Sequence, residues 1–390
     1  MSPTVGVIGA AGFFGWHLRC RLATFGGDSV AADRTTFSDQ DALDRFVEAA
    51  DVVVHIAGVN RAHDEGAIVA GNVGLAKSLV DARARTEASF DVIYANTVKA
   101  GEPGPYGESK AMAATKLGAD ATSAGNRFVD IRFPHLFGEF GVPHYNSGVT
   151  TFAHQLARGE ESTVNDGQLE LLHAQDASQI ILDAIDDQRH GPLRPPGREI
   201  TVPDCYATMA RLAEPYVAAG VVPHIGDEIG AGVEVDEIDD QFELRLFNTI
   251  RSQMWPDAYP MQLTKHADQR GAFFEVVRAW GQGQTSISTT VPGVIRGEHF
   301  HFDKVERFAV ISGQARIRVR RLFTDQAVIF DVSGDDPVFI DMPPLCTHDI
   351  TNTGSSELVT LFWSHDHFDP AKADTYPMKV VAEDGEALPA

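Results

Sequence analysis

The sequence has few cysteines, few basic residues and no long apolar run. Its three cysteines, Cys20, Cys205 and Cys346, are far apart and form no CxxC pair. This pattern argues against a disulfide framework and favours a reducing compartment. No apolar run approaches the length of a membrane span, and the N-terminus lacks the charged and apolar segments of a signal peptide. We therefore expect a cytoplasmic protein that does not bind membranes.

Positive charge is also scarce. Lys and Arg number 32 against 55 Asp and Glu, which gives a formal net charge of −23. A surface for nucleic acid or anionic lipid would need a basic face, so neither is expected as the main partner. The hydrophobic content of 43% is nevertheless sufficient for buried cores. The length of 390 residues predicts two or three domains.

The first half alternates short runs of β-branched residues with longer amphipathic stretches. The short runs predict strands at 5–8, 29–32, 52–56, 92–94 and 128–131. The longer stretches predict helices at 16–25, 41–49, 69–83 and 108–119. Strands that alternate with helices indicate an α/β fold with a doubly wound parallel sheet of the Rossmann type.

The pattern changes in the second half. Residues 225–243 are strongly acidic and contain glycine, which we interpret as a solvated loop with short helices. After a Pro- and aromatic-rich stretch at 254–260, short strands are predicted at 272–277, 284–290, 307–311, 315–320, 326–332, 338–342 and 357–363. Such strands are typical of an all-β sandwich or small barrel. We predict a nucleotide-binding domain at 1–250, a linker at 251–258 and a barrel domain at 259–390.

A glycine-rich motif separates the first predicted strand from the first helix. Gly9 allows a tight turn, Gly12 lets a pyrophosphate approach the backbone, and Gly15 lets the helix pack close to the sheet. The helix N-terminus then presents free N–H groups to the phosphates. The motif predicts dinucleotide contacts at Gly9, Ala11, Gly12, Phe13, Phe14 and Gly15.

The second predicted strand ends at Asp33 and Arg34, which favour different cofactors. A carboxylate at this place would bind the ribose hydroxyls of NAD, whereas an arginine would bind the 2′-phosphate of NADP. We assign NADP(H) because of Arg34, and NAD stays open as the alternative.

A catalytic set is predicted after the fourth strand. Tyr106 and Lys110 are four residues apart on a helix and therefore lie on one face of it. The ammonium group can lower the pKa of the Tyr106 phenol, which prepares the tyrosine to exchange a proton with a carbonyl oxygen. Thr97 lies nine residues upstream and could polarise the same carbonyl.

The glycine motif, Thr97 and the YxxxK motif together resemble the extended short-chain dehydrogenases/reductases. The resemblance implies that Thr97, Tyr106 and Lys110 are the catalytic residues and that Lys110 also binds the nicotinamide ribose. Residues 55–61 and 132–138 resemble cofactor and substrate segments of that family. These segments imply cofactor contacts at Ala57, Gly58 and Pro134 and substrate contacts at Arg61 and His135. His135 stands where the family usually has asparagine.

The second half carries the motif His299-Phe-His301-x4-Glu306. Residues two apart on a strand share a face, so both imidazoles can point into a barrel, with Glu306 at the start of the next strand. His348 supplies a third imidazole at a later strand. Three imidazoles and one carboxylate around an open position suit a divalent transition metal, for which zinc is our first choice.

These motifs resemble the two cupin motifs, except that Leu345 stands where the second usually has glycine. Residues 268–275 and 294–299 also resemble the opening strands of nucleotide-sugar 3,5-epimerases. In those enzymes the histidine matching His299 is the base that removes a proton next to a ketone. His299 is therefore a metal ligand or a general base, and the ligand set around it favours a ligand. His365 and His367 are interpreted as surface residues.

The order of the two halves resembles a family of bifunctional enzymes of capsular polysaccharide synthesis. The resemblance covers nearly the whole chain, includes residues 55–61, 105–110, 144–147 and 268–275, and is weakest at about 205–258. It adds Asn146 and Ser147 to the implied substrate contacts. Gly167 stands where the family has a basic residue.

The family resemblance implies two successive reactions on one nucleotide sugar. The cupin domain would epimerise C3 of a UDP-4-keto-6-deoxy-hexosamine, and the reductase domain would then reduce the C4 ketone with NADPH. The implied product is UDP-2-acetamido-2,6-dideoxy-β-L-talose, on the route to UDP-N-acetyl-L-fucosamine. The family also implies a homodimer.

Two other hypotheses are compatible with the sequence. In the first, the chain is a reductase only, and the cupin is a metal-stabilised dimerisation module. In the second, the chain is a non-catalytic NAD(P)-sensing protein, against which the intact pair of Tyr106 and Lys110 argues.

Overall fold

The computed structural model describes residues 2–225, 237–281 and 283–381. Its contacts divide the chain into two compact units. Unit 1 comprises Met1–Phe137, Tyr145–Ser147 and Gly167–Thr201. Unit 2 comprises Gly138–His144, Gly148–Asp166 and Val202–Ala390. The units are not consecutive halves of the sequence, and the domain boundary at 251–258 stays a prediction.

Unit 1 is built on a six-stranded parallel sheet with the strand order β2-β1-β3-β4-β5-β8. Its strands are β1 (Val5–Ile8), β2 (Ser29–Ala32), β3 (Val52–His55), β4 (Asp91–Thr97), β5 (Phe128–Phe133) and β8 (Gly191–Leu193). The strands β1 and β3 are buried along their whole length. Strands buried on both faces read as continuous apolar runs, which is why the sequence pattern predicted β1 to β5, although it missed the short edge strand β8.

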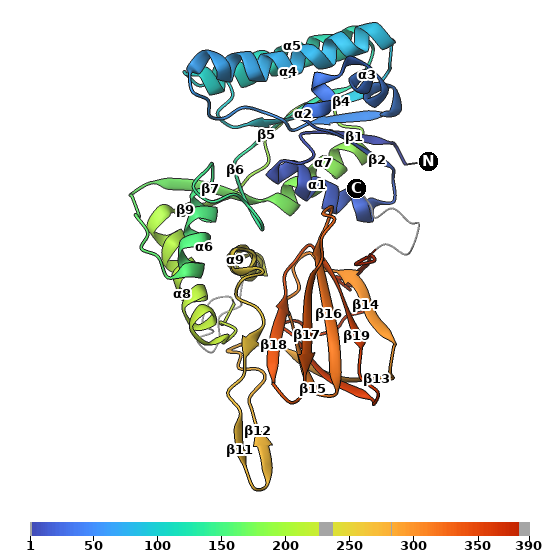
Figure 1. Cartoon of the computed structure of the whole chain (residues 1–390). Helices are drawn as coiled ribbons and strands as arrows, with labels where there is room; N and C mark the ends of the chain where they lie inside the picture. The colour runs from blue at the N-terminus through green and yellow to red at the C-terminus, as the bar shows by residue number, and fades with distance from the viewer. Residues whose placement is uncertain (1, 226–236, 282, 382–390) are drawn as a thin grey trace. The chain divides into compact units, whose positions relative to one another are not determined.

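Helices cover both faces of this sheet (Figure 1). One face packs against α1 (Phe13–Phe25) and α7 (Ala174–Asp186), and the other against α3 (Gln40–Ala49), α4 (Glu65–Thr86) and α5 (Pro105–Ser123). The short α2 (Arg34–Ser38) follows β2. A separate small sheet joins β6 (His135–Phe137), β7 (Gln168–His173) and β9 (Arg198–Thr201). The predicted doubly wound fold is thereby confirmed.

The helices α1 and α5 begin three residues before their predicted starts, for a shared reason. The first turn of each contains residues with little helix propensity. Gly12 is the N-cap of α1, and Pro105 is the first residue of α5. Proline suits the first helical position because its missing N–H would have no partner there in any case.

The strands of unit 2 form two five-stranded antiparallel sheets that enclose one apolar core. The first sheet has the order β10 (Met261–Gln262), β18 (Val338–Met342), β15 (Glu306–Ser312), β20 (Leu358–Ser364), β13 (Gln284–Thr290). The second has the order β17 (Val328–Ser333), β16 (Gln314–Arg321), β19 (Cys346–Asn352), β14 (Ile295–Phe300), β21 (Tyr376–Pro377). This arrangement confirms the predicted all-β barrel of the jelly-roll kind.

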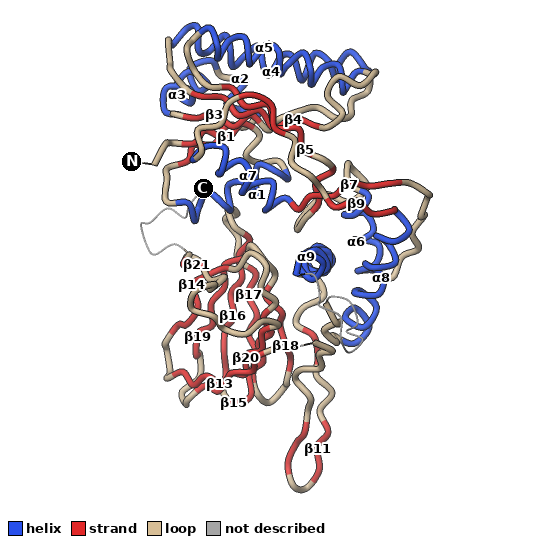
Figure 2. Tube along the Cα trace, turned by 180° about the vertical axis from the view of Figure 1, so that it is seen from behind, coloured by secondary structure: helices blue, strands red, loops and turns tan. Residues whose placement is uncertain are grey.

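An exposed hairpin of β11 (His266–Asp268) and β12 (Gly271–Phe273) extends away from the barrel strands (Figure 2). The strand predicted at 272–277 therefore ends earlier than expected.

Three helices, α6 (Gly148–Arg158), α8 (Val202–Ala219) and α9 (Glu237–Met254), complete unit 2. The predicted acidic loop at 225–243 is wrong from Glu237 onward, and residues 226–236 lie outside the described residues. Buried Phe247, Ile250 and Met254 form an apolar stripe on α9 that the acidic residues before it obscured. No helix in the described ranges is both long and apolar enough to cross a membrane.

A buried polar cluster ties α8 and α9 to the barrel. The Arg307 guanidinium donates to both carboxylate oxygens of Asp341, at 2.7 and 2.8 Å. Tyr216 of α8 donates to Asp341 at 2.6 Å, and Arg251 of α9 donates to the Met342 carbonyl at 2.7 Å. All these side chains are buried. Because each charge has a hydrogen-bonded partner, burial is tolerated here, although removal of one partner would strand the other.

We expect Asp341→Ala to lower the free energy of unfolding by about 3–5 kcal/mol, because it leaves the Arg307 charge buried and uncompensated. The matched control is Asp331→Ala, which breaks the exposed pair of Asp331 and Arg316 in the same barrel and should cost far less. Urea unfolding followed by circular dichroism measures both. Equal losses for the two variants would show that the buried cluster does not hold unit 2 together.

Candidate functional sites

The glycine motif forms a tight loop between β1 and α1. Gly9 has a φ of 90°, and a Cβ on it would lie 2.8 Å from the backbone nitrogen of Ala57. A Cβ on Gly15 would lie 2.1 Å from the Gly9 carbonyl oxygen. Both positions therefore require glycine, whereas Ala11 and Gly12 are exposed in front of the helix. The exposed N-terminus of α1 is suited to bind the phosphates of a dinucleotide.

The segment after β3 lies beside this loop. The N–H groups of Ile56 and Ala57 both donate to the Ile8 carbonyl at 3.0 Å. The two loops meet where the strand order reverses between β1 and β3, at the carboxyl ends of the strands, which is the usual nucleotide site of such sheets. The predicted cofactor residues Ala57 and Gly58 are thus brought next to the glycine loop.

Asn72 of α4, which sequence reasoning missed, holds this segment in place. Its side-chain oxygen accepts the Val59 N–H at 2.7 Å, and its amide donates to the Val59 carbonyl at 3.0 Å and to Ser109 at 2.9 Å. Asn72 is buried. A buried asparagine within a helix was the only available signal, and its partner on α5 is 37 residues away.

The predicted catalytic residues meet at the ends of β4 and α5. Thr97 is the last residue of β4, and its hydroxyl is hydrogen-bonded to the Tyr106 hydroxyl. One turn along α5, the buried Lys110 ammonium donates to the Ala95 carbonyl at 3.0 Å and lies 4.1 Å from the Tyr94 ring centre. The three side chains therefore form one cluster. The hydroxyls of Thr97 and Tyr106 pair with each other, and the Lys110 ammonium lies one helical turn further along α5.

The expected lowering of the Tyr106 pKa by Lys110 is not found. Burial raises the pKa of Tyr106, and its hydrogen bond with Thr97 only partly opposes this. The reason is that Lys110 faces Ala95 and Tyr94. Burial also lowers the pKa of Lys110 to about 7, against the attraction of Asp130.

His55 ends β3 next to this site. It is buried, and neither ring nitrogen has a hydrogen-bond partner among the described residues. Burial, followed by repulsion from Lys110, lowers the pKa of His55 to about 3. The ring instead makes an edge contact with Tyr94 at 5.4 Å between centroids.

The residues after β2 differ in how they are used. Asp33 caps α2, and its Oδ1 accepts the N–H groups of Thr35 and Thr36 at 2.8 and 3.1 Å. Arg34 is exposed at the first position of that helix. The carboxylate expected to bind a ribose is thus engaged in capping, whereas the guanidinium faces solvent.

The predicted substrate residues are only partly brought together. His135 begins β6, and its Nε2 lies 3.2 Å from the Ser147 hydroxyl. Burial, with repulsion from Lys99, lowers the pKa of His135. Pro134 is buried between β5 and β6, and Arg61 and Asn146 are exposed.

The four predicted metal ligands converge in the barrel. Each residue offers one atom that could bind a metal, and these four atoms all lie within 4.8 Å of one another. The residues are His299, His301, Glu306 and His348. The Glu306 carboxylate lies 2.9 Å from His301 Nε2 and 3.6 Å from His348 Nε2. His348 Nε2 is buried and has no hydrogen-bond partner among the residues that the structure describes. This orphaned nitrogen next to a carboxylate fits a bound cation.

The charges of the cluster also suit a metal. Burial, with repulsion from the other imidazoles, lowers the pKa of His299 to about 4. Burial by itself would raise the pKa of Glu306, but His301 and His348 hold that pKa well below its usual range. Neutral imidazole and ionised carboxylate are the forms that bind metal ions.

Two backbone distortions set the ligand positions. Glu298, with a φ of 58°, forms an irregularity in the β14–β19 ladder directly before His299. Leu345, with a φ of 59°, occupies the position where the cupin motif usually has glycine. A positive φ explains that glycine preference, and for a leucine it is unusual. The Leu345 N–H donates to the His301 carbonyl at 2.8 Å, and its side chain is buried.

His365 is not the surface residue that the sequence predicted. It is half-buried, and its Nδ1 accepts the Val305 N–H at 3.0 Å. Burial lowers the pKa of His365 to about 4. The residue directly after β20 thus returns beside the turn between His301 and Glu306, which the local sequence could not indicate. His367 is exposed as expected.

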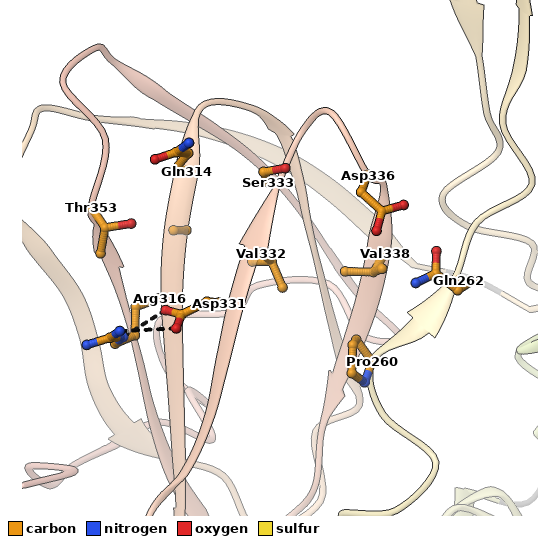
Figure 3. Close-up of a pocket in the computed structure, with 11 residues that line it drawn as sticks. Pro260, Gln262, Gln314, Arg316, Asp331, Val332, Ser333, Asp336, Val338 and Thr353 are labelled. Carbon is orange, nitrogen blue, oxygen red and sulfur yellow. Dashed lines mark hydrogen bonds and ion pairs between the residues drawn. The ribbon is translucent and has the colours of Figure 1, made fainter.

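A groove lies at the other end of the barrel (Figure 3). Its lining includes Gln314 and Ser333, which pair at the start of β16, whereas His348 pairs with Val319 near the end of that strand. The charged pair in the groove, Arg316 and Asp331, is closed on itself at 2.8 Å. The groove therefore offers a weaker candidate site than the histidine cluster.

Comparisons with known proteins match both parts of the chain. The model of the NAD dependent epimerase/dehydratase family matches residues 5–194, and that of the polysaccharide biosynthesis C-terminal domain matches residues 266–376. The spore coat polysaccharide biosynthesis protein SpsL of Bacillus subtilis is 26% identical over 123 residues, which is 29% of this chain and 82% of the relative.

Two relatives match nearly the whole chain. The UDP-2-acetamido-2,6-beta-L-arabino-hexul-4-ose reductase of Pseudomonas aeruginosa is 28% identical over 379 residues, covering 96% of this chain and 98% of the relative. The crystal structure of the capsular polysaccharide assembling protein CapF from Staphylococcus aureus is 30% identical, with a TM-score of 0.59. That match covers 96% of this chain and 100% of the CapF chain.

The buried His55 predicts a specific acid sensitivity. Between pH 6.5 and about 3 the unfolded chain binds a proton at His55 that the folded chain excludes. The free energy of unfolding therefore decreases as the pH is lowered through this range. The variant His55→Leu has no ionisable group at this position and therefore lacks this contribution to the pH dependence. The free energy of unfolding of the wild type should therefore drop, relative to the variant, by up to about 1.4 kcal/mol per pH unit below pH 6. Urea unfolding at pH 5.0, 6.0 and 7.0 measures this, and parallel curves would contradict it.

Proposed function

This chain belongs to the family of the capsular polysaccharide assembling protein CapF, and we propose that it is a bifunctional oxidoreductase and epimerase acting on a nucleotide sugar. The proposed substrate is a UDP-4-keto-6-deoxy-hexosamine, epimerised at C3 and then reduced at C4. The observation that carries the proposal is the match of nearly the whole chain to a hexul-4-ose reductase, together with two preformed clusters, one in each unit.

We propose that unit 1 performs the reduction with Thr97, Tyr106 and Lys110. NADPH would supply the hydride when bound. The Tyr106 hydroxyl would donate a proton to the C4 oxygen, and Thr97 would hold that oxygen through its own hydroxyl. The high pKa that burial gives Tyr106 keeps it protonated, as a proton donor requires. Lys110, which does not lower the Tyr106 pKa in this structure, would instead hold the nicotinamide ribose of the bound cofactor.

The proposed cofactor is NADP(H) rather than NAD. Asp33 uses its Oδ1 to cap α2, while Arg34 is exposed beside it and available for a 2′-phosphate. The glycine loop at 9–15 and the segment 57–58 would hold the rest of the dinucleotide. Arg61, His135, Asn146 and Ser147 are the proposed substrate contacts.

We propose that the barrel binds a divalent metal, zinc as first choice, through His299, His301, Glu306 and His348. Such a metal would stabilise negative charge on the substrate oxygen when the C3 proton is removed. The same ketone thus acidifies C3 in the first reaction and accepts hydride in the second. The proposed assembly is a homodimer of two-domain chains divided near residues 251–258.

Tyr106→Phe should abolish reduction and leave epimerisation intact. The variant lacks only the proton donor, so NADPH oxidation with a UDP-4-keto-6-deoxy-hexosamine should fall by about 10²–10⁴-fold. The variant should still bind NADPH, as measured by the change in NADPH fluorescence on binding. The control is Tyr206→Phe, which keeps the ring contact with Phe152 and should react normally. A Tyr106 variant with normal turnover would refute the assignment.

His348→Ala should have the opposite effect. It removes a buried ligand, so zinc measured by mass spectrometry should be lost, along with exchange of the C3 hydrogen for deuterium in heavy water. Binding of NADPH should stay unchanged. Deuterium exchange that persisted without His348 and without metal would refute the role of the metal in epimerisation. Absence of exchange already in the wild-type chain would favour the hypothesis of a reductase with a dimerisation module.

A further inference from the structure

A short turn, residues 301–305, connects two of the proposed ligands, His301 and Glu306. Its backbone is held by the carboxylate of Asp374, about 70 residues later in the chain. That carboxylate accepts three successive N–H groups, from Phe302 and Asp303 at 2.8 Å and from Lys304 at 3.0 Å. Three charge-assisted hydrogen bonds to one carboxylate fix the path of the turn.

The backbone of Asp374 also reaches the ligand itself. Nδ1 of His301 is hydrogen-bonded to the Asp374 carbonyl oxygen. Because a carbonyl can only accept, Nδ1 must carry the proton. The Nε2 atom of His301 then faces the Glu306 carboxylate at 2.9 Å, where a cation could replace a proton. A carbonyl on the far nitrogen is the common outer partner of histidines that bind metals.

The segment that carries Asp374 is itself firmly anchored. Its strand β21 pairs with His299 and Phe300 of β14, and the Tyr376 ring stacks on Phe300 with 5.4 Å between centroids. Further along, the buried Arg320 donates to the carbonyls of Lys379 and Val380 at 2.8 and 2.7 Å. Asp374 is therefore placed by the barrel and not by a loose tail.

The other side of the turn is held by α9. The Asn248 amide donates to the Asp303 carbonyl at 2.8 Å, and Gln241 donates to the Asp303 carboxylate at 3.1 Å. His365 binds the Val305 backbone. Asp374, α9 and His365 therefore all support the turn, and among the described contacts of these three only Asp374 also bonds to the side chain of a proposed ligand.

We propose that Asp374 is a positioning residue of the metal site, which sets the orientation and the protonated nitrogen of His301 through its carboxylate grip on residues 302–304. The inference rests on the proposed function, because it requires that the four-residue cluster binds a metal. Without the carboxylate, the Asp374 carbonyl would move away from Nδ1, and His301 would lose its fixed orientation.

The test is zinc affinity of the full-length chain, measured by competition with a chromophoric chelator. We expect Asp374→Ala to weaken zinc binding by about 10–100-fold, as loss of an outer partner does elsewhere. Asp374→Asn keeps the size but offers one acceptor oxygen and a repelling NH2 group, so we expect a smaller loss in the same direction. The matched control is Asp369→Ala, whose carboxylate accepts only the nearby Ala371 N–H among its described contacts.

A second readout separates positioning from general stability. Cobalt(II) in place of zinc reports ligand geometry through its visible absorption, which should change in Asp374→Ala and Asp374→Asn but not in Asp369→Ala. Urea unfolding of each variant, followed by circular dichroism, confirms that the barrel is folded. If Asp374→Ala does not fold, Asp374→Asn decides the question.

The outcomes distinguish this inference from the proposed function. Wild-type zinc affinity and an unchanged cobalt spectrum in both Asp374 variants, with zinc lost in His348→Ala, would overturn only the role of Asp374. A wild-type chain that binds neither zinc nor cobalt would overturn the proposed metal site and, with it, this inference.

Discussion

The buried ion pair of Arg307 and Asp341 is the interaction on which the geometry of unit 2 depends. Arg307 of β15 pairs with Asp341 of β18 across the two strands. The next pair in the register joins their sequence neighbours, Glu306 and Met342. Successive residues of a strand point to opposite faces. The ion pair therefore lies on one face of these strands, and the Glu306 carboxylate lies on the other. Tyr216 of α8 and Arg251 of α9 hydrogen-bond to the face of β18 that carries the ion pair, and so connect both helices to it.

The ion pair also explains why the helices and the barrel form one unit. A charged pair on the back of two barrel strands would otherwise face solvent, where it would be worth little. Covered by α8 and α9, it must be fully satisfied. Tyr216 donates to Asp341, and the remaining donors of Arg307 bond to the carbonyls of Gly220 and Val276. Tyr259 and Arg251 in turn bond to the Tyr216 hydroxyl. The turn beside the histidine cluster rests on the same helix, since Asn248 binds the carbonyl of Asp303.

The two candidate sites solve opposite electrostatic problems in a chain with a net charge of −23. In unit 1, the site for an anionic dinucleotide uses the N-terminus of α1, the exposed Arg34 and the buried Lys110. In unit 2, imidazoles hold the pKa of the half-buried Glu306 carboxylate well below its usual range, which is the arrangement that a cation would require. The acidic excess therefore says little about either site, because local burial and backbone dipoles decide the charge that each one binds.

The sequence by itself was sufficient for the fold class, for most strands of the parallel sheet and of the barrel, and for the two clusters of candidate residues, because their signals are local. Apolar runs such as Val52–Val54, the glycine loop and the spacing of His299 and His301 all act within a few residues. The helix at Glu237–Met254 was missed because acidic residues hid its stripe, and Asn72 and Asp374 because their partners are distant in sequence. Only the tertiary structure decided those long-range hydrogen bonds and the pKa directions at Tyr106 and Lys110, since burial and the choice of partner arise only when distant segments pack together.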